Sequence, residues 1–187
     1  SFEMVMVMLH WIFDLVPLAD MAVVARTVGT VGVGPLAQMG WFVVAVVVAL
    51  VLQAVFYLGR LTLVSWVRPI AFLKGGFDAF AMAFSTASSA ATLPITYGCA
   101  KDKIRVQEES ASLGVMVGGT FNHDGTALYE AMAALFVSQM LGLHLSLEQQ
   151  AVVVLMAIVA SVGAAGIPEA GLVTMLAVFN AVHLPIE

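Results

Sequence analysis

Charged residues are scarce in this sequence of 187 residues, where Asp, Glu, Lys and Arg together make up only 10%. A soluble domain carries about 25% charged residues. Hydrophobic residues make up 61% of the chain, which is too much for one soluble core because some apolar faces would have nothing to pack against. A lipid bilayer solvates such faces. The composition therefore indicates a membrane protein whose surroundings are lipid, with no nucleic acid as a partner.

Four long stretches contain no charged residue at all. A membrane-spanning helix needs about 20 mostly apolar residues, and the first of the four stretches supplies that number with room to spare. The stretches lie between Arg26 and Arg60, from Ala79 to Ala100, from Ala131 to Leu147, and from Gln149 to Pro168.

Cysteine is nearly absent, and the single Cys99 excludes an internal disulfide framework. The chain also lacks a recognisable signal peptide, because Ser1-Phe2-Glu3-Met4 offers neither a basic region nor a cleavage site. It stops abruptly at Glu187. We expect both ends to be cuts through a longer protein.

The few basic residues are unevenly placed, since six of the seven fall between residues 60 and 105. Cytoplasmic segments of membrane proteins carry an excess of Lys and Arg, so this stretch is expected to border the cytoplasm. The segment 68–105 would then begin and end on the same side of the membrane. The six residues are Arg60, Arg68, Lys74, Lys101, Lys103 and Arg105.

Two apolar segments, 69–103 and 148–185, are interrupted in comparable positions. The first contains the hydroxyl-rich stretch Ser85–Pro94 and the second contains the small-residue stretch Gly163–Gly171. Hydroxyls and a proline at mid-depth do not suit one straight, lipid-facing helix. They indicate two half-helices that meet at a tip, and paired broken segments of this kind are typical of inverted-repeat transporters.

The remaining apolar segments predict helices. They cover residues 4–28, 36–59 and 111–143, and the last is broken near its middle by Gly118–Thr126. The stretch Gly29–Pro35 predicts a turn. The expected fold is therefore all-α: a polytopic helical membrane protein with two re-entrant hairpins and a polar site at mid-depth.

Asp124 is the strongest candidate for a functional side chain. An ionised carboxylate at mid-membrane is costly and usually functional, and a sodium ion offsets that cost by binding hard oxygen ligands. Asn122 and Thr120 supply further oxygens, and Gly125 lets the chain turn its carbonyls inward. The alternative is a carboxylate paired with a basic residue, for which only His123 is at hand.

The first tip carries Ser88 and Ser89, with Pro94 as the expected stop of a half-helix. Their hydroxyls and the free N–H groups of a helix N-terminus suit a carboxylate. The alternative is that small residues merely permit close helix packing.

The second tip, Gly163–Gly171, has the glycines of a flexible gate or of a simple interhelical turn. Glu169 within it faces water or approaches a bound cation. His123 suits either proton transfer or a packed ring with one hydrogen bond. Asp14 and Glu130 have no clear place in this scheme.

Three motifs, in this order and spacing, resemble the signatures of the dicarboxylate/amino acid:cation symporter family, which includes the glutamate transporters and the sodium:dicarboxylate symporters. Each motif alone is weak, but the three together are highly specific and extend over nearly the whole chain. They are Ser88-Ser89-Ala90-Ala91-Thr92-Leu93-Pro94, Asn122-His123-Asp124-Gly125-Thr126 and Gly163-Ala164-Ala165-Gly166-Ile167-Pro168.

The resemblance implies a partial elevator-type transport domain and a trimeric full-length protein in the cell membrane, with the bacterial inner membrane as the expected location. Residues 1–35 would be a scaffold-type transmembrane helix and its connecting loop. Residues 36–187 would be the transport-domain core, made of a transmembrane helix at 36–66, a re-entrant hairpin at 69–103, a transmembrane helix at 110–143 and a second re-entrant hairpin at 148–185. Four earlier helices and a later one would be missing from the chain.

The resemblance also implies roles for individual residues, with Na⁺ as the coupling ion and no organic cofactor. The second hairpin would be the extracellular gate. Substrate-binding positions would be Ser88, Ser89, Thr126, Ile167, Pro168 and Gly171, and cation-binding positions would be Thr120, Asn122, Asp124, Ser161, Val162 and Ala164.

Several residues depart from the family pattern. Ala87 stands where some members carry arginine, His123 replaces the usual methionine, Ala90 replaces a third serine, and Glu169 replaces a small residue. These departures leave the substrate open and bring a change of coupling ion into play.

The expected activity is sodium-coupled symport of a small carboxylate, either an acidic amino acid or a C4 dicarboxylate. A proton-coupled or neutral amino acid symporter of the same family is an alternative. An anion channel is a second class, but a channel needs polar lining along whole helices, whereas polarity here is confined to the breaks. A hydrolase using Ser89, His123 and Asp124 is a third, and adjacent His and Asp on a helix point about 100° apart, which disfavours it. We therefore expect a transporter and not an enzyme.

Overall fold

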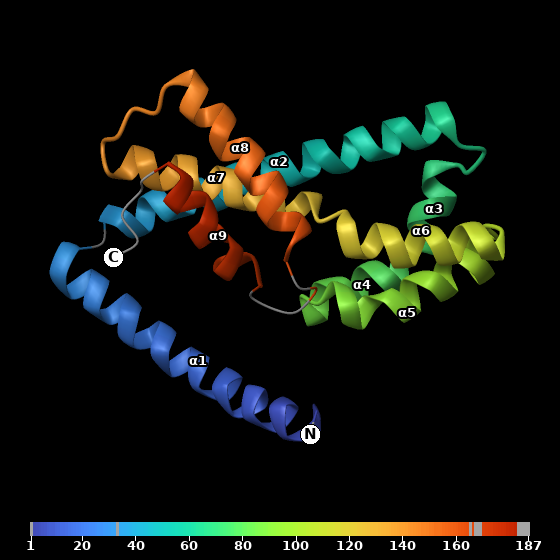
Figure 1. Ribbon diagram of the computed structural model, residues 1–187, viewed down its shortest axis with the longest axis horizontal. Helices are drawn as coiled ribbons and strands as arrows, with labels where there is room; N and C mark the ends of the chain where they lie inside the picture. Colours follow the sequence, from blue (N-terminus) through green and yellow to red (C-terminus); the bar gives the residue numbers. More distant parts are fainter. Residues whose placement is uncertain (1, 33, 165, 167–169, 183–187) are drawn as a thin grey trace. The chain divides into compact units, whose positions relative to one another are not determined.

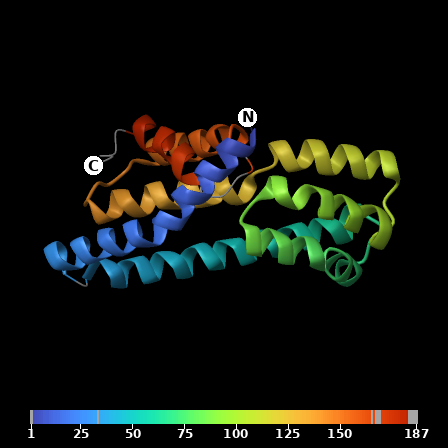
Figure 2. The ribbon, with the colours of Figure 1, turned by 90° about the horizontal axis from the view of Figure 1, so that it is seen from below.

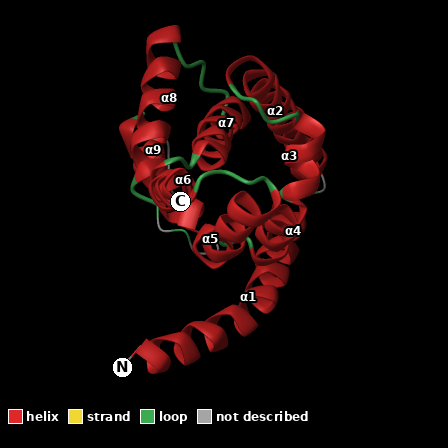
Figure 3. Ribbon diagram, turned by 90° about the vertical axis from the view of Figure 1, so that its right-hand side faces the viewer, coloured by secondary structure: helices red, strands yellow, loops and turns green. Residues whose placement is uncertain are grey.

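The computed structural model of the chain describes residues 2–32, 34–164, 166 and 170–182 (Figure 1). Every regular element in these residues is helical, with no strand among them (Figure 3). This confirms the all-α fold class. The elements are α1 (Phe2–Val31), α2 (Gly34–Val64), α3 (Pro69–Gly75), α4 (Phe77–Thr86), α5 (Ser89–Gly98), a π-helical turn η1 (Cys99–Lys103), α6 (Glu108–Phe121), α7 (Asp124–Met140), α8 (Leu147–Val162) and α9 (Ala170–Ala181).

The chain divides into two units, Ser1–Val44 and Ala45–Glu187. The first unit holds α1 and the start of α2. The turn predicted at Gly29–Pro35 is too long, because α1 continues through Val31 and α2 begins at Gly34. Among the described residues of this stretch, Gly32 alone shows the left-handed backbone of a turn, with φ +84°. Pro35 lies in the first turn of α2, where a proline is tolerated because its missing N–H has no partner to lose.

Helix α2 is the element best suited to contact lipid. Its segment Gln38–Val64 is the one helix among the described residues that is long and apolar enough to cross a membrane. Large apolar side chains along it are exposed, for example Val55 and Phe56. A surface of this kind needs lipid or another apolar partner to cover it.

The helices of the two predicted hairpins are shorter than a membrane is thick. Helices α4 and α5 have 10 residues each, or about 15 Å, and α8 and α9 have 16 and 12, or about 24 and 18 Å. The hydrocarbon core measures about 30 Å. These lengths fit half-helices that turn back at a tip, which is the geometry a re-entrant hairpin needs.

The first hairpin turns at Ala87 and Ser88. Ala87 adopts the left-handed conformation, with φ 47° and ψ 27°, and its N–H bonds the carbonyl of Ala83 to close α4. Ser88 is the N-cap of α5. Pro94 does not stop this helix as predicted, because a missing N–H removes only the bond to the carbonyl of Ala90 and α5 continues to Gly98.

The predicted break in the segment 110–143 is narrower than Gly118–Thr126. Helix α6 continues to Phe121 and α7 starts at Asp124, so only Asn122 and His123 lie outside helical geometry. Glycines in a helix interior are unfavourable but tolerated.

The core of the second unit lies among α7, α8 and α9, which pack against one another (Figure 2). Alanines at the contact let the helix backbones approach closely, as in other membrane bundles. The α8 N-terminus carries a capping box made by Ser146 and Gln149. The buried core residues are Ala134, Val153, Ala157, Val178 and Phe179.

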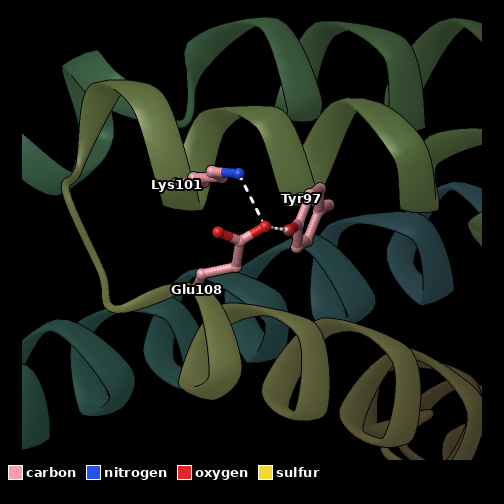
Figure 4. Close-up of polar contacts among 3 residues, drawn as sticks. All are labelled: Tyr97, Lys101 and Glu108. Atoms are coloured by element: carbon pink, nitrogen blue, oxygen red, sulfur yellow. Dashed lines mark hydrogen bonds and ion pairs between the residues drawn. The ribbon is translucent and has the colours of Figure 1, made fainter.

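Helix α5 packs against both α4 and α6. Polar contacts join α5, η1 and α6 at the end of these helices that lies away from the α4–α5 tip. Lys101 bonds Glu108 at 2.7 Å, and Tyr97 donates to the same carboxylate oxygen at 3.2 Å (Figure 4). The Lys101 bond lowers the pKa of Glu108, and the same bond raises the pKa of Lys101. Lys103 and Asp78 form a second ion pair at 2.5 Å.

Candidate functional site

The second unit contains three helix breaks: the α4–α5 tip, the α6–α7 break and the connection between α8 and α9. Hydrogen bonds join the first to the third at Gly166, and they join the second to the last turn of α8 at Ser161. The sequence predicted polar residues at each break, and the structure brings the breaks together. Ile167 and Pro168, and the neighbouring Glu169, lie outside the described residues.

Ser88 holds the two tips together. Its side chain is buried, accepts from the N–H of Ala91 at 3.2 Å and donates to the carbonyl of Gly166 at 2.8 Å. The N–H of Ala90 donates to the same carbonyl at 3.0 Å. The N-terminus of α5, which was predicted to bind an anion, therefore directs its donors at the carbonyl of Gly166. Ser89 is exposed and lies beside the same glycine.

Asp124 is the first residue of α7, where the positive end of the helix dipole stabilises a negative charge. With its NH₂ group facing the carboxylate, the Asn122 amide donates to both oxygens of Asp124, at 3.3 Å to Oδ2. The hydroxyl of Thr120 donates to the carbonyl of Met116 at 2.7 Å, which leaves lone pairs on that oxygen. An amide and a carboxylate thus lie together at this break, and the Thr120 hydroxyl lies on the last turn of α6.

A cavity of about 260 Å³ lies beside these groups. Its lining includes Gln53 and Tyr57 of α2 on one side and Asn122, Asp124 and Gly125 on the other. The Gln53 amide donates to the Tyr57 hydroxyl at 3.4 Å. Sequence reasoning missed these two residues, although a polar pair four positions apart on an otherwise apolar helix was a readable signal.

His123 joins the α6–α7 break to the end of α8. Its Nδ1 lies 3.0 Å from the carbonyl oxygen of Ser161, one of the predicted cation ligands. The same oxygen accepts from the N–H of Ala164 at 3.1 Å. Val162, predicted with them, has an exposed side chain, but its proposed ligand is a backbone carbonyl.

The hydrolase alternative finds no support in this arrangement. His123 Nδ1 faces Ser161, whereas a triad needs Asp124 at that nitrogen. His123 Nε2, which would activate Ser89, is buried and has no hydrogen-bond partner within the described chain.

Thr126 and Gly171 are a predicted pair of substrate contacts on different helices. A Cβ placed on Gly171 would lie 3.4 Å from Cγ2 of Thr126, so the Thr126 side chain lies directly against the α9 backbone. The structure therefore positions these two residues together.

Glu130 is a buried acidic residue that the sequence left without a place. It is 0% exposed, and the Thr174 hydroxyl of α9 donates to its Oε1. Its Oε2 has no hydrogen-bond partner in the described part of the chain. A carboxyl group buried with one neutral partner is a functional candidate.

The donor set suits a hard cation. Zinc and iron sites usually contain three or more His, Cys, Asp or Glu side chains. Among the described residues no such group is placed to hold a metal ion. One carboxylate with amide, hydroxyl and backbone oxygens is the kind of set that alkali and alkaline-earth ions accept.

Comparison with known proteins identifies a family and several relatives. Residues 1–187 match the sequence model of a family described as the sodium:dicarboxylate symporter family. Mouse excitatory amino acid transporter 2 is 41% identical over 174 residues, which cover 92% of this chain and 28% of that protein. Human excitatory amino acid transporter 5 is 42% identical over 151 residues, covering 80% and 27%.

An excitatory amino acid transporter of Caenorhabditis elegans is 50% identical over 120 residues, covering 64% of this chain and 24% of that protein. The chain thus spans about a quarter of the length of the curated relatives it matches. These relatives are named as transporters, which agrees with the expectation of a transporter and not an enzyme.

Proposed function

The chain belongs to the sodium:dicarboxylate symporter family, and from that premise we propose that it is the binding core of a secondary active transporter. The proposed activity is symport of a small carboxylate with Na⁺. The substrate is an acidic amino acid or a C4 dicarboxylate. The names of the relatives favour the acidic amino acid.

One observation carries this proposal: hydrogen bonds join the N-terminus of α5 to Gly166, and they join the α6–α7 break, which is followed by Asp124, to the end of α8. A half-helix N-terminus binds a carboxylate, and unwound carbonyls bind a cation. The two kinds of group lie on neighbouring breaks, so an anion and a cation bound there stabilise each other electrostatically.

One proposed cation position takes side-chain oxygens from Thr120, Asn122 and Asp124, and another takes backbone oxygens from Ser161, Val162 and Ala164. The proposed substrate site takes Ser88 and Ser89 from the first hairpin, Thr126 from α7, and Ile167, Pro168 and Gly171 from the second hairpin. Binding of both ligands closes the second hairpin, and the closed core moves across the membrane as an elevator. Coupling between the ligands is then a linkage of their binding free energies.

The proposal extends to the surroundings. The exposed apolar face of α2 is covered by lipid or by a neighbouring domain, and the full-length protein assembles as a trimer in the cell membrane, in a bacterium the inner membrane.

A second candidate is proton-coupled symport on the same fold, and Glu130 is the observation that favours it. A fully buried carboxyl whose one partner among the described residues is a hydroxyl is able to take up and release a proton as its surroundings change. A neutral amino acid is then an alternative substrate. An anion channel is disfavoured because the polar side chains are grouped at the breaks.

The test is uptake of radiolabelled aspartate, succinate and serine into proteoliposomes that hold the natural full-length protein, with and without an inward sodium gradient. Asp124→Asn keeps the size of the side chain and removes its charge, and Asp102→Asn in η1 is the control for loss of an acidic residue elsewhere. Sodium-driven uptake that Asp124→Asn abolishes and Asp102→Asn preserves supports the proposal. Uptake that ignores sodium and survives Asp124→Asn contradicts it.

A further inference from the structure

We propose that His123 is a latch that competes with the coupling cation for the backbone carbonyl of Ser161. The inference rests on the proposed function, because it takes this carbonyl to be one of the cation's ligands. It assigns to His123 a positioning role: the imidazole holds the second hairpin to the α6–α7 break and must release it when the cation binds.

The contact fixes the chemical form of the histidine. Its Nδ1 lies 3.0 Å from the Ser161 oxygen, and a carbonyl oxygen only accepts hydrogen bonds, so Nδ1 carries the proton and donates it. Ser161 is 3% exposed, so water does not compete freely for this oxygen.

Donors already surround the Ser161 oxygen. It accepts from the backbone N–H groups of Gly163 and Ala164, the latter at 3.1 Å, and from His123 at 3.0 Å. A cation that binds this oxygen is repelled by the donor protons and binds more tightly when one of them withdraws. The Gly163 and Ala164 N–H groups belong to the turn that ends α8, whereas the imidazole sits on a rotatable side chain, so the imidazole is the donor that leaves.

Within the described residues, the bond to Ser161 is the one hydrogen bond of the ring, because its other nitrogen, Nε2, is buried without a partner there. Among those residues no second hydrogen bond opposes rotation of the imidazole away from Ser161, which a latch requires.

The position of His123 gives the release a mechanical consequence. It precedes α7 with φ −97° and ψ 48°, outside helical geometry, and its side chain reaches the last turn of α8. Because α8 is the first arm of the second hairpin, breaking this bond removes a tie between that hairpin and the cation site. Cation binding and hairpin release become one event.

Two substitutions separate the hydrogen bond from the bulk of the ring. His123→Leu fills similar space without a donor. His123→Asn is the matched control, because its Nδ2 lies as many bonds from the backbone as Nδ1 of histidine and still donates.

The measurement is the thermal unfolding midpoint of the purified full-length protein without substrate, at increasing NaCl, with choline chloride holding the ionic strength constant. Loss of one competing hydrogen bond should lower the half-effective NaCl concentration of His123→Leu about threefold to tenfold. His123→Asn should stay close to wild type. An unchanged or higher half-effective concentration for His123→Leu overturns the latch.

A measurement on the wild type keeps the proposal testable if His123→Leu does not fold. In protein labelled with ¹⁵N-histidine, the His123 Nδ1 resonance, identified by its loss in His123→Asn, should shift as NaCl replaces choline chloride. A resonance that does not respond to sodium also overturns the latch.

Failure of the latch and failure of the proposed function look different. Sodium-dependent uptake by the wild type together with an unaltered sodium response of His123→Leu removes the latch alone. A wild type whose uptake and unfolding midpoint both ignore sodium removes the proposed function, and the latch with it.

Discussion

The hydroxyl of Ser88 donates a 2.8 Å hydrogen bond to the carbonyl of Gly166, 78 residues further along the chain. Ser88 caps α5, so this carbonyl lies at the positive end of that helix, where an anion also binds well. The Ala90 N–H donates to the same oxygen. A substrate carboxylate that binds at the α5 N-terminus, as proposed above, would compete with Gly166 for these donors, and its binding would depend on the position of the second tip.

The space at Gly166 leads to the first prediction. A Cβ there would lie 3.0 Å from the Ala90 nitrogen and 3.4 Å from the Cβ atoms of Ser89 and Ala90. Gly166→Ala must push the tips apart by a few tenths of an ångström and weaken both hydrogen bonds. We expect the rate of substrate uptake to fall about tenfold, which corresponds to about 1.4 kcal/mol, measured as initial uptake into proteoliposomes.

Gly163→Ala is the control for this effect. Among the described residues, a Cβ at Gly163 would meet only the carbonyl oxygen of Ala160, at an ordinary 3.5 Å. Its uptake should remain near the wild-type rate. Equal losses in the two variants would mean that general stiffening of the hairpin, and not the contact with the first tip, explains the effect.

The sequence predicted the helical class and the broken segments because both depend on local signals. Charge-free runs and clusters of Gly, Ser and Pro are visible without any knowledge of packing. The limits of the breaks were less predictable. Pro94 lies inside α5, and Gly118 and Gly119 inside α6, since packing against neighbouring helices overrides the weak helix propensity of single residues.

The candidate site was predictable only as a set of residue types. Asp124 and Asn122 stand two positions apart, so their proximity follows from sequence. The contact between His123 and Ser161 joins residues 38 positions apart, and the burial of Glu130 against Thr174 joins residues 44 positions apart. Such pairs depend on how helices pack, which a single sequence does not encode in readable form.

The close approach of α5 and α6 gives the second prediction. A Cβ on Gly119 would lie 2.4 Å from Cδ2 of Leu93, so Gly119→Ala forces the leucine side chain to move. We expect a destabilisation of about 1–3 kcal/mol from overpacking, measured by thermal unfolding in detergent. Leu93→Ala in the same chain should recover part of this loss, because it removes the clashing atoms.

Gly118→Ala separates crowding from backbone effects. It lies in the same helix with nothing within 4 Å of its added Cβ, and alanine is the better helix former by about 1 kcal/mol. It should be neutral or stabilising. A Gly118→Ala protein as unstable as Gly119→Ala would show that the α5–α6 contact is not the cause.

The third prediction concerns the exposed ion pair of Lys101 and Glu108. The hydrogen bond between them lowers the pKa of Glu108 below its ordinary 4.5 and raises the pKa of Lys101 above its ordinary 10.5. The glutamate's contribution to stability is therefore present above about pH 4.5 and is lost as pH falls through the lowered pKa. The lysine's contribution is present below about pH 10.5 and is lost as pH rises through the raised pKa.

Glu108→Gln should accordingly lower the unfolding midpoint slightly at pH 7, and the difference from wild type should vanish in acid and shrink in high salt. Glu109→Gln is the matched control, because it removes the neighbouring acidic residue and leaves the Lys101 partner in place. A difference between Glu108→Gln and wild type that persists below the lowered pKa would show that the ion pair is not its source.

The last prediction tests proton coupling at Glu130. Its carboxyl is fully buried, and Thr174 is the partner of Oε1, so a glutamine of nearly the same shape fits the space but carries no exchangeable carboxyl proton. If the transporter moves a proton through Glu130, a proton gradient will accelerate wild-type uptake and leave Glu130→Gln unaffected, while sodium still drives uptake by both. Thr174→Val is the companion variant, because it removes the hydroxyl partner, keeps the carboxyl, and should retain the response to the proton gradient. A Glu130→Gln protein that still responds to the gradient would show that the proton moves elsewhere, and Glu130 would then be a structural group whose burial Thr174 makes tolerable.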